Sequence, residues 1–222
     1  MTSETPTIIS ELFPDFFKLH GEWCDFFFSD EMEELIWKTL EQLQSNKRAF
    51  YPSSENIFRC FYKTRYEEIK VVLIGQEPYY NAATGLCFEV KKGNLLNSSL
   101  QNIYKELKTE GFYPTEDGCL LSWANQGVLL LNTALTMSSG DPGSHLEIWG
   151  PFTEKIFKKL SEKEFIVWII LGEQAAGWKN LISGHHILLE ASHPSQCSFL
   201  GSNIFKNVNN ELYKKGIDKI VW

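Results

Sequence analysis

Two side chains that suit acid–base chemistry, and one amide, occur at the ends of apolar segments in this sequence. Glu77 lies in the segment Gln-Glu-Pro-Tyr-Tyr at 76–80, directly after the apolar run 69–75. Asn132 and His193 follow two later apolar runs. A carboxylate and an imidazole in one crevice can transfer protons or stabilise opposite charges in a transition state. If the fold brings these segments together, we expect a hydrolytic site.

No competing catalytic signature occurs in the chain. The patterns Gly-x-Ser-x-Gly and Gly-x-Gly-x-x-Gly are both absent. A histidine after a strand and an asparagine at a turn are also common as structural residues, so the residues alone do not decide whether His193 and Asn132 are catalytic or structural. The cysteines are odd in number and have no C-x-x-C spacing, which argues against both a disulfide framework and a zinc site. They are Cys24, Cys60, Cys87, Cys119 and Cys197.

Four apolar runs have the length and the β-branched character of strands that are buried on both faces. They cover residues 69–74, 127–131, 165–171 and 186–189.

Helical patterns separate these runs. A helix over 100–107 follows a capping box that begins at Ser98, and a second helix begins with Pro151 in its first turn. The apolar spacing at 178–182 predicts a third, and a helix over 32–43 precedes the first strand.

The alternation of strands and helices predicts an α/β fold with a central, mostly parallel, four-stranded sheet flanked by helices on both faces. The carboxyl ends of parallel strands share one edge of the sheet, where open α/β folds keep their active sites. Gln76, Glu77, Asn132, Glu173 and His193 would meet there. From the residues alone we predict a metal-free enzyme with an α/β fold that catalyses a hydrolysis.

Length and composition predict one domain, residues 1–222, in which 1–50 form a helical region packed on the core. This region is rich in aromatic residues, which usually pack inward. They are Phe13, Phe16, Phe17, Trp23, Phe26, Phe27, Phe28 and Trp37.

The formal charge of −7 argues mildly against a protein that lives on nucleic acid, although a small local contact is compatible with it. No run approaches the roughly 18 apolar residues of a membrane span, and residues 1–10 lack a signal-peptide pattern. We expect a soluble intracellular protein without a membrane partner, cytoplasmic if prokaryotic and otherwise nuclear or wherever the genome resides.

The segment 71–80, Val-Val-Leu-Ile-Gly-Gln-Glu-Pro-Tyr-Tyr, resembles the signature V-V-I-L-G-Q-D-P-Y-H of family 1 uracil-DNA glycosylases. The likeness extends from about residue 51 to 212. Other segments resemble landmarks of that family in the same order, namely 85–88, 102–107, 127–132, 149–153 and 193–195.

This resemblance implies a pocket that receives a uracil flipped out of DNA and hydrolyses its N-glycosidic bond without metal or cofactor. The uracil-binding residues would be Gln76, Tyr79, Phe88 and Asn132. Asn132 would read the uracil edge, Phe88 would stack on the base, and Tyr79 would exclude the thymine methyl group.

The resemblance also implies the catalytic residues and the DNA contacts. His193 would donate to the uracil oxygen that gains charge, and Glu77 would orient the attacking water and stabilise the positive sugar. Ser99 and Ser195 match serines that contact DNA phosphates, although such hydroxyls often bond only locally.

Several positions depart from the family pattern. Glu77 is one methylene longer than the usual aspartate, and Tyr80 replaces a histidine, which leaves its role uncertain. Glu173 stands where the family has a serine near a phosphate. The segment 95–98 replaces a proline-rich loop.

The apolar wedge that enters the duplex is also altered. Cys197 occupies the position of the family's leucine, so we expect Phe199 or Leu200 to serve as the wedge.

The predicted function is that of a monofunctional uracil-DNA glycosylase in base excision repair. One alternative is a catalytically weak or inactive relative that acts as a DNA-binding or protein-partner subunit, which Glu77, Tyr80 and Glu173 favour. Another is a glycosylase for xanthine or hypoxanthine. The expected partner is single- or double-stranded DNA that contains uracil, with a replication or inhibitor protein as a further candidate, and we expect a monomer.

Overall fold

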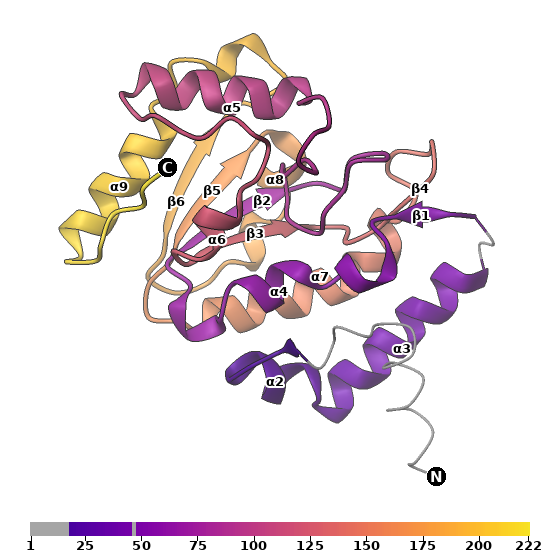
Figure 1. Cartoon of the computed structure of the whole chain (residues 1–222). Coiled ribbons are helices and arrows are strands. Elements are labelled where there is room, and N and C mark those ends of the chain that lie inside the picture. The colour runs from indigo at the N-terminus through magenta and orange to yellow at the C-terminus, as the bar shows by residue number, and fades with distance from the viewer. Residues whose placement is uncertain (1–17, 46–47) are drawn as a thin grey trace.

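The computed structural model describes residues 18–45 and 48–222 and is built around a parallel sheet (Figure 1). The order of its strands is β3-β2-β5-β6, and each neighbouring pair is parallel. Helices cover both faces, so the predicted α/β fold is confirmed. The strands are β2 (Val71–Gly75), β3 (Val128–Asn132), β5 (Val167–Leu171) and β6 (Ile187–Ala191).

The four strands of this sheet differ in burial. Every residue of β2, β3 and β5 is buried, as their continuous apolar runs predict. The prediction that the run 186–189 is buried on both faces is wrong, because the residues of β6 alternate between half-buried and exposed. The outward face of β6 carries Leu188 and Glu190. The other edge strand of the sheet, β3, is buried throughout.

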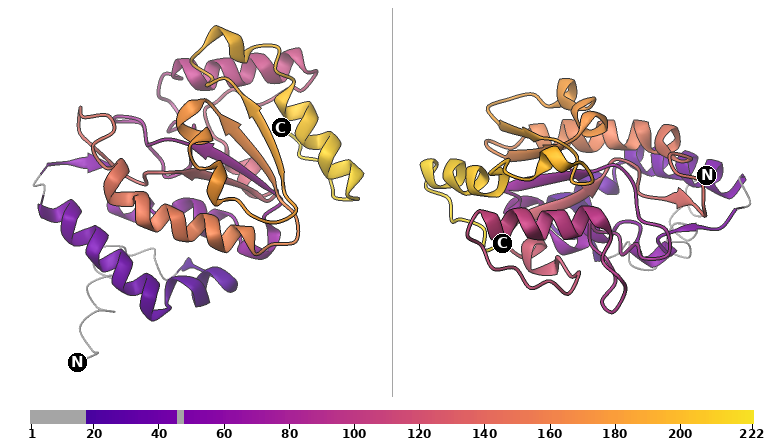
Figure 2. Two further views of the ribbon diagram at one scale, coloured as in Figure 1. Left: turned by 180° about the vertical axis from the view of Figure 1, so that it is seen from behind. Right: turned by 90° about the horizontal axis from the view of Figure 1, so that it is seen from above.

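Helices and a small second sheet surround these strands. Figure 2 shows α5 (Ser98–Thr109) and α9 (Ile204–Lys214) on one side of the sheet and α7 (Leu146–Ser161) on the other. The two-stranded sheet consists of β1 (Phe50–Tyr51) and β4 (Met137–Ser138). The remaining α-helices are α2 (Glu22–Phe27), α3 (Asp30–Ser45), α4 (Arg59–Lys63), α6 (Leu121–Ala124) and α8 (Glu173–Ala176).

Two helix starts differ from prediction. Asn97, not Ser98, caps α5, because its side-chain oxygen accepts a hydrogen bond from the Leu100 N–H at 2.9 Å. Pro151 lies inside α7 rather than in its first turn, since the helix begins five residues earlier at Leu146.

The helix predicted over 178–182 is also wrong. That stretch holds only a 3₁₀ turn over Lys179–Leu181, after the four-residue α8.

Four of the aromatic residues before residue 50 pack on the core, namely Trp23, Phe26, Phe27 and Phe28, whereas Trp37 is half-buried on α3 and is not part of this packing. The Trp23 and Phe27 side chains are fully buried, and their rings contact Phe61 at centroid distances of 5.0 Å. Helix α3, which confirms the helix predicted over 32–43, packs against α7. Phe13, Phe16 and Phe17 lie outside the described residues.

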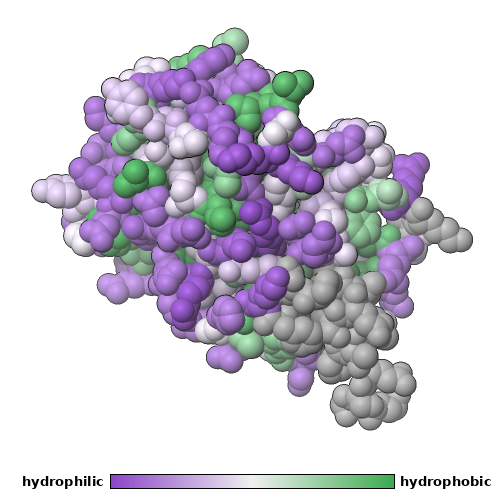
Figure 3. Space-filling model, viewed as in Figure 1, coloured by the Kyte–Doolittle hydropathy of each residue, from purple (hydrophilic) through white to green (hydrophobic). Residues whose placement is uncertain are grey.

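The surface is mixed in character. On the face shown in Figure 3, hydrophobic residues form separate small patches among hydrophilic ones. Within residues 18–45 and 48–222, no helix has the length and apolarity needed to cross a bilayer.

Candidate active site

The carboxyl ends of the central strands form one wall of a cavity of about 300 Å³. Parallel pairing places Gly75 beside Asn132 and Leu171 beside Ala191, so the segments that follow β2, β3 and β6 meet at the same edge. The cavity is lined by Gly75, Gln76, Glu77, Pro78, Tyr79, Tyr80, Phe88, Asn132, Met137, Pro142 and His193.

Two glycines let the functional side chains approach the backbone. A Cβ atom on Gly75 would lie 2.3 Å from Oδ1 of Asn132. A Cβ atom on Gly172, which has a φ of +86°, would lie 2.8 Å from Cβ of His193. Neither distance is tolerable for a larger residue, so both positions make room for the site.

The Glu77 carboxylate is fixed at one oxygen. Its Oε2 accepts a hydrogen bond of 2.7 Å from the backbone N–H of Gly143, in the loop after β4. Burial raises the pKa of this carboxyl, the Gly143 N–H opposes the rise, and the negative charge of Asp141 adds to it. Oε1 has no hydrogen-bond partner in the described part of the chain, so it can hold a water molecule.

The hydrogen bonds of His193 select its tautomer. The Ser195 N–H donates to Nδ1 at 3.2 Å, and the Ser195 hydroxyl lies 2.8 Å from the same atom. Because Nδ1 accepts, the neutral ring carries its proton on Nε2. Burial lowers the pKa of His193, which favours this neutral donor. The ring centroid lies 6.2 Å from that of Phe88.

Asn132 gives the cavity a polar wall, and Tyr79 gives it a bulky one. Asn132 is only 7% exposed, and its amide has no hydrogen-bond partner among residues 18–45 and 48–222. Because Asn132 lines the cavity, its amide is available to donate to and accept from a ligand there. Burial raises the pKa of Tyr79 to about 12, so its phenol is neutral; the Ser99 hydroxyl opposes the rise.

The other candidate residues lie around this cavity. The Gln76 backbone carbonyl accepts from the Ala134 N–H at 2.9 Å, which fixes the start of the loop. Tyr80 is 53% exposed at the rim. Ser195 is exposed beside His193, whereas Ser99 is buried in the first turn of α5.

The wedge prediction is corrected for Phe199. Its side chain is fully buried, because a 3₁₀ turn over Cys197–Phe199 directs it into the core, so it is not available to enter DNA. Leu200 is 44% exposed and keeps the wedge role as a proposal.

Several residues of the site were not predicted. The Gly143 N–H, Met137 and Pro142 reach the cavity from β4 and the loop that follows it. The glycine-rich, turn-forming sequence at 138–143 indicates a loop at the rim, but nothing in it indicates a contact with Glu77.

Comparison with known proteins assigns this cavity to a family. The model of the uracil DNA glycosylase superfamily matches residues 61–213, more than half of the chain. The chain belongs to the uracil DNA glycosylase superfamily. The resemblance read from the sequence is therefore confirmed at the level of the superfamily.

Relatives and solved structures support the assignment over most of the chain. The uracil-DNA glycosylase of Francisella tularensis subsp. novicida is 40% identical over 214 residues, which cover 90% of this chain and 97% of the relative. That of Desulfitobacterium hafniense is 38% identical over 216 residues, covering 92% and 96%. The mimivirus uracil-DNA glycosylase matches with a TM-score of 0.84 and 25% identity, covering 96% and 92%. A variant of the mimivirus enzyme was solved in complex with UGI.

Proposed function

We propose that the cavity receives a uracil flipped out of DNA and that the chain hydrolyses its N-glycosidic bond, leaving an abasic site. The observation that carries this is the unpaired Asn132 amide in a cavity that also contains Phe88, a carboxylate and a neutral histidine. A flat polar base would satisfy the amide and stack on the aromatic ring.

Base selection follows from the walls of the cavity. The Asn132 amide donates to O4 of uracil and accepts from N3–H, whereas cytosine presents the reverse pattern. The Tyr79 ring stands where a 5-methyl group would lie, which excludes thymine by steric conflict. Phe88 supports the face of the base.

His193 and Glu77 stabilise charges of opposite sign in the transition state. As the bond between C1′ and N1 breaks, its electron pair stays on uracil, and the His193 Nε2–H stabilises the charge at O2 by about 3 kcal/mol. The ionised Glu77 faces the positively charged sugar and holds the water whose oxygen bonds to C1′. Glu77 takes the proton that this water loses.

The DNA contacts are proposed from position and exposure. Ser195 is exposed and contacts His193 of the cavity, and Leu200 is exposed five residues further along the chain, so the two are candidates to contact a phosphate and a base step. Ser99 is buried beside Tyr79, so a contact with DNA requires the phosphate to approach closely. We also propose that an inhibitor or replication protein can bind this DNA-binding face, a role supported by the mimivirus complex with UGI.

Two variants test the pocket. Asn132→Asp removes the donor to O4, so the ratio of kcat/KM for uracil over cytosine should fall by at least about 10²-fold. His193→Leu should lower kcat about 10²-fold without changing thermal unfolding. Unchanged kinetics in both variants would remove the assignment, and inactive wild-type protein that still binds DNA would support the non-catalytic alternative.

A further inference from the structure

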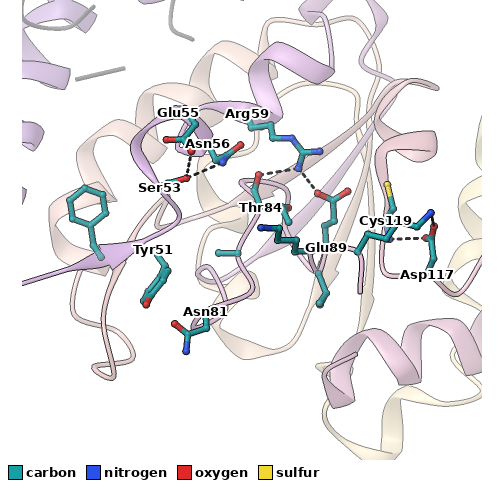
Figure 4. Close-up of a pocket in the computed structure, with 15 residues that line it drawn as sticks. Tyr51, Ser53, Glu55, Asn56, Arg59, Asn81, Thr84, Glu89, Asp117 and Cys119 are labelled. Carbon is teal, nitrogen blue, oxygen red and sulfur yellow. Dashed lines mark hydrogen bonds and ion pairs between the residues drawn. The ribbon is translucent and has the colours of Figure 1, made fainter. Parts of the chain in front are cut away.

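A second, larger cavity of about 660 Å³ opens beside the proposed active site (Figure 4). We call it the flanking groove. Tyr51 and Asn81 lie at one end, and Asp117 and Cys119 lie at the other. Its wall also includes Arg59 and Lys91. None of the steps proposed above uses this groove.

Two tyrosines connect the flanking groove to the active-site cavity. Tyr80 lines the cavity and Tyr51 lines the groove, and their rings pack edge to face with centroids 5.3 Å apart. Tyr80 is 53% exposed, Tyr51 is half-buried, and the next residue, Asn81, is exposed. A chain that leaves the cavity over Tyr80 therefore meets a second aromatic ring at the entrance to the groove.

Two acidic side chains in the wall of the groove already have partners. The Glu55 carboxylate accepts a hydrogen bond of 2.6 Å from the Ser53 hydroxyl. The Glu89 carboxylate pairs with Arg59 and accepts from the Leu120 N–H at 3.0 Å (Figure 4). The same Arg59 donates to the Thr84 carbonyl oxygen at 3.0 Å. Glu89 and Arg59 neutralise each other and are held inside the wall.

The rim of the groove carries an available cation. Asp117 accepts from the Cys119 N–H at 3.0 Å and lies 3.4 Å from the Lys92 ammonium. Lys91 is exposed and has no acidic partner among the residues that the structure describes. The Lys91 ammonium is therefore free to bind an anion.

We propose that the flanking groove holds, as a single strand, the nucleotides next to the target uracil on one side. An unpaired base can stack on Tyr51, and a phosphate can bind Lys91, which is how proteins commonly hold single strands. A base-paired strand would not present a free face to the ring. This inference rests on the proposed function, because it assigns a path to the same DNA substrate.

Substrates of different length test the path. We would measure kcat and KM for single-stranded oligonucleotides that carry one uracil and extend on both sides, only on the 5′ side, only on the 3′ side, or by a single nucleotide. The wild-type protein should show a lower KM when one particular side is extended.

Variants of the groove should remove this decrease in KM for the extended substrate. Lys91→Ala should raise KM for the long substrate several-fold and reduce the slope of log KM against log salt by about 0.7, the value for one single-strand phosphate contact. Tyr51→Leu should raise KM at least about fivefold, the low end for a base–aromatic stack, and Tyr51→Phe should restore it. kcat, and KM for the shortest substrate, should not change.

Lys206→Ala is the matched control, because it removes the same charge from an exposed position on α9, where the ammonium has no acidic partner among the described residues. An unchanged KM in both groove variants would overturn the proposal, as would equal effects on long and short substrates. If the wild-type protein released no uracil, fluorescence anisotropy with the same oligonucleotides would still test the groove. Binding that is insensitive to Lys91 and Tyr51 would then refute it independently of the glycosylase function.

Discussion

Shortening Glu77 to aspartate tests whether this site is built around the longer side chain. In the structure, Oε2 of Glu77 lies 2.7 Å from the Gly143 nitrogen. Glu77→Asp withdraws the carboxylate by up to about 1.5 Å, the length of one C–C bond. The distance to the Gly143 nitrogen then approaches about 4 Å, which is too long for a hydrogen bond.

The expected loss follows from that distance. A hydrogen bond to a charged group contributes about 1.5–3 kcal/mol, and a misplacement of about 1 Å at a reacting centre can reduce the rate about 10²-fold. We therefore expect Glu77→Asp to lower kcat by about 10- to 100-fold. KM should change less than about threefold, because Asn132, Phe88 and Tyr79 still bind the base.

Single-turnover kinetics on a uracil-containing single strand measure the chemical step directly. Glu147→Asp is the matched control, since it makes the same chemical change at an exposed position in the first turn of α7. Thermal unfolding of both variants shows whether the fold is retained. A higher rate for Glu77→Asp would refute the claim that the site is built around the longer side chain, and would show that the native glutamate lowers the rate of the chemical step.

Three further predictions follow from burial and charge. The rate should fall as the pH drops through the raised pKa of Glu77, and Asp141→Asn, which removes a repelling charge, should move this acid limb of the pH–rate profile to lower pH. Phe199→Ala should lower the free energy of unfolding by about 3–5 kcal/mol, whereas Leu200→Ala should change it by less than about 1 kcal/mol, which denaturant titration checks. Leu200→Ala should also raise KM, but only for duplex substrates, which kinetics check. Burial raises the pKa of Glu110 to about 7, so its stabilising contribution is present at low pH and is lost as the pH rises from about 4.5 to 7. Glu110→Gln should remove about 1–2 kcal/mol of this pH dependence, a value that allows for solvent screening. The free energy of unfolding, measured against pH, checks this.

The buried strands and the edge where the site forms could be predicted from the sequence. The runs that became β2, β3 and β5 are apolar throughout, and the parallel fold that they predict places Glu77 and Asn132 together. The exposure of β6 could not be predicted, because both β3 and β6 are edge strands and only the packing of other segments decides which edge is covered. Helices α4 and α6 contact β3, which is buried throughout.

Other features of the site depend on contacts that leave no pattern in the sequence. The partner of Glu77 is a backbone N–H 66 positions away, and any residue except proline could supply it. Phe199 and Leu200 are equally apolar neighbours, and only the turn at Cys197–Phe199 decides which one is buried. Tertiary packing, not residue type, settles both.

The most direct test of the central claim is excision of uracil by the wild-type protein. Purified protein would be incubated, with EDTA present, with end-labelled single strands that carry one uracil, thymine or cytosine at the same position, followed by alkaline cleavage. The account predicts a strand break at uracil and none at thymine or cytosine. No break at uracil with enzyme in excess would contradict it.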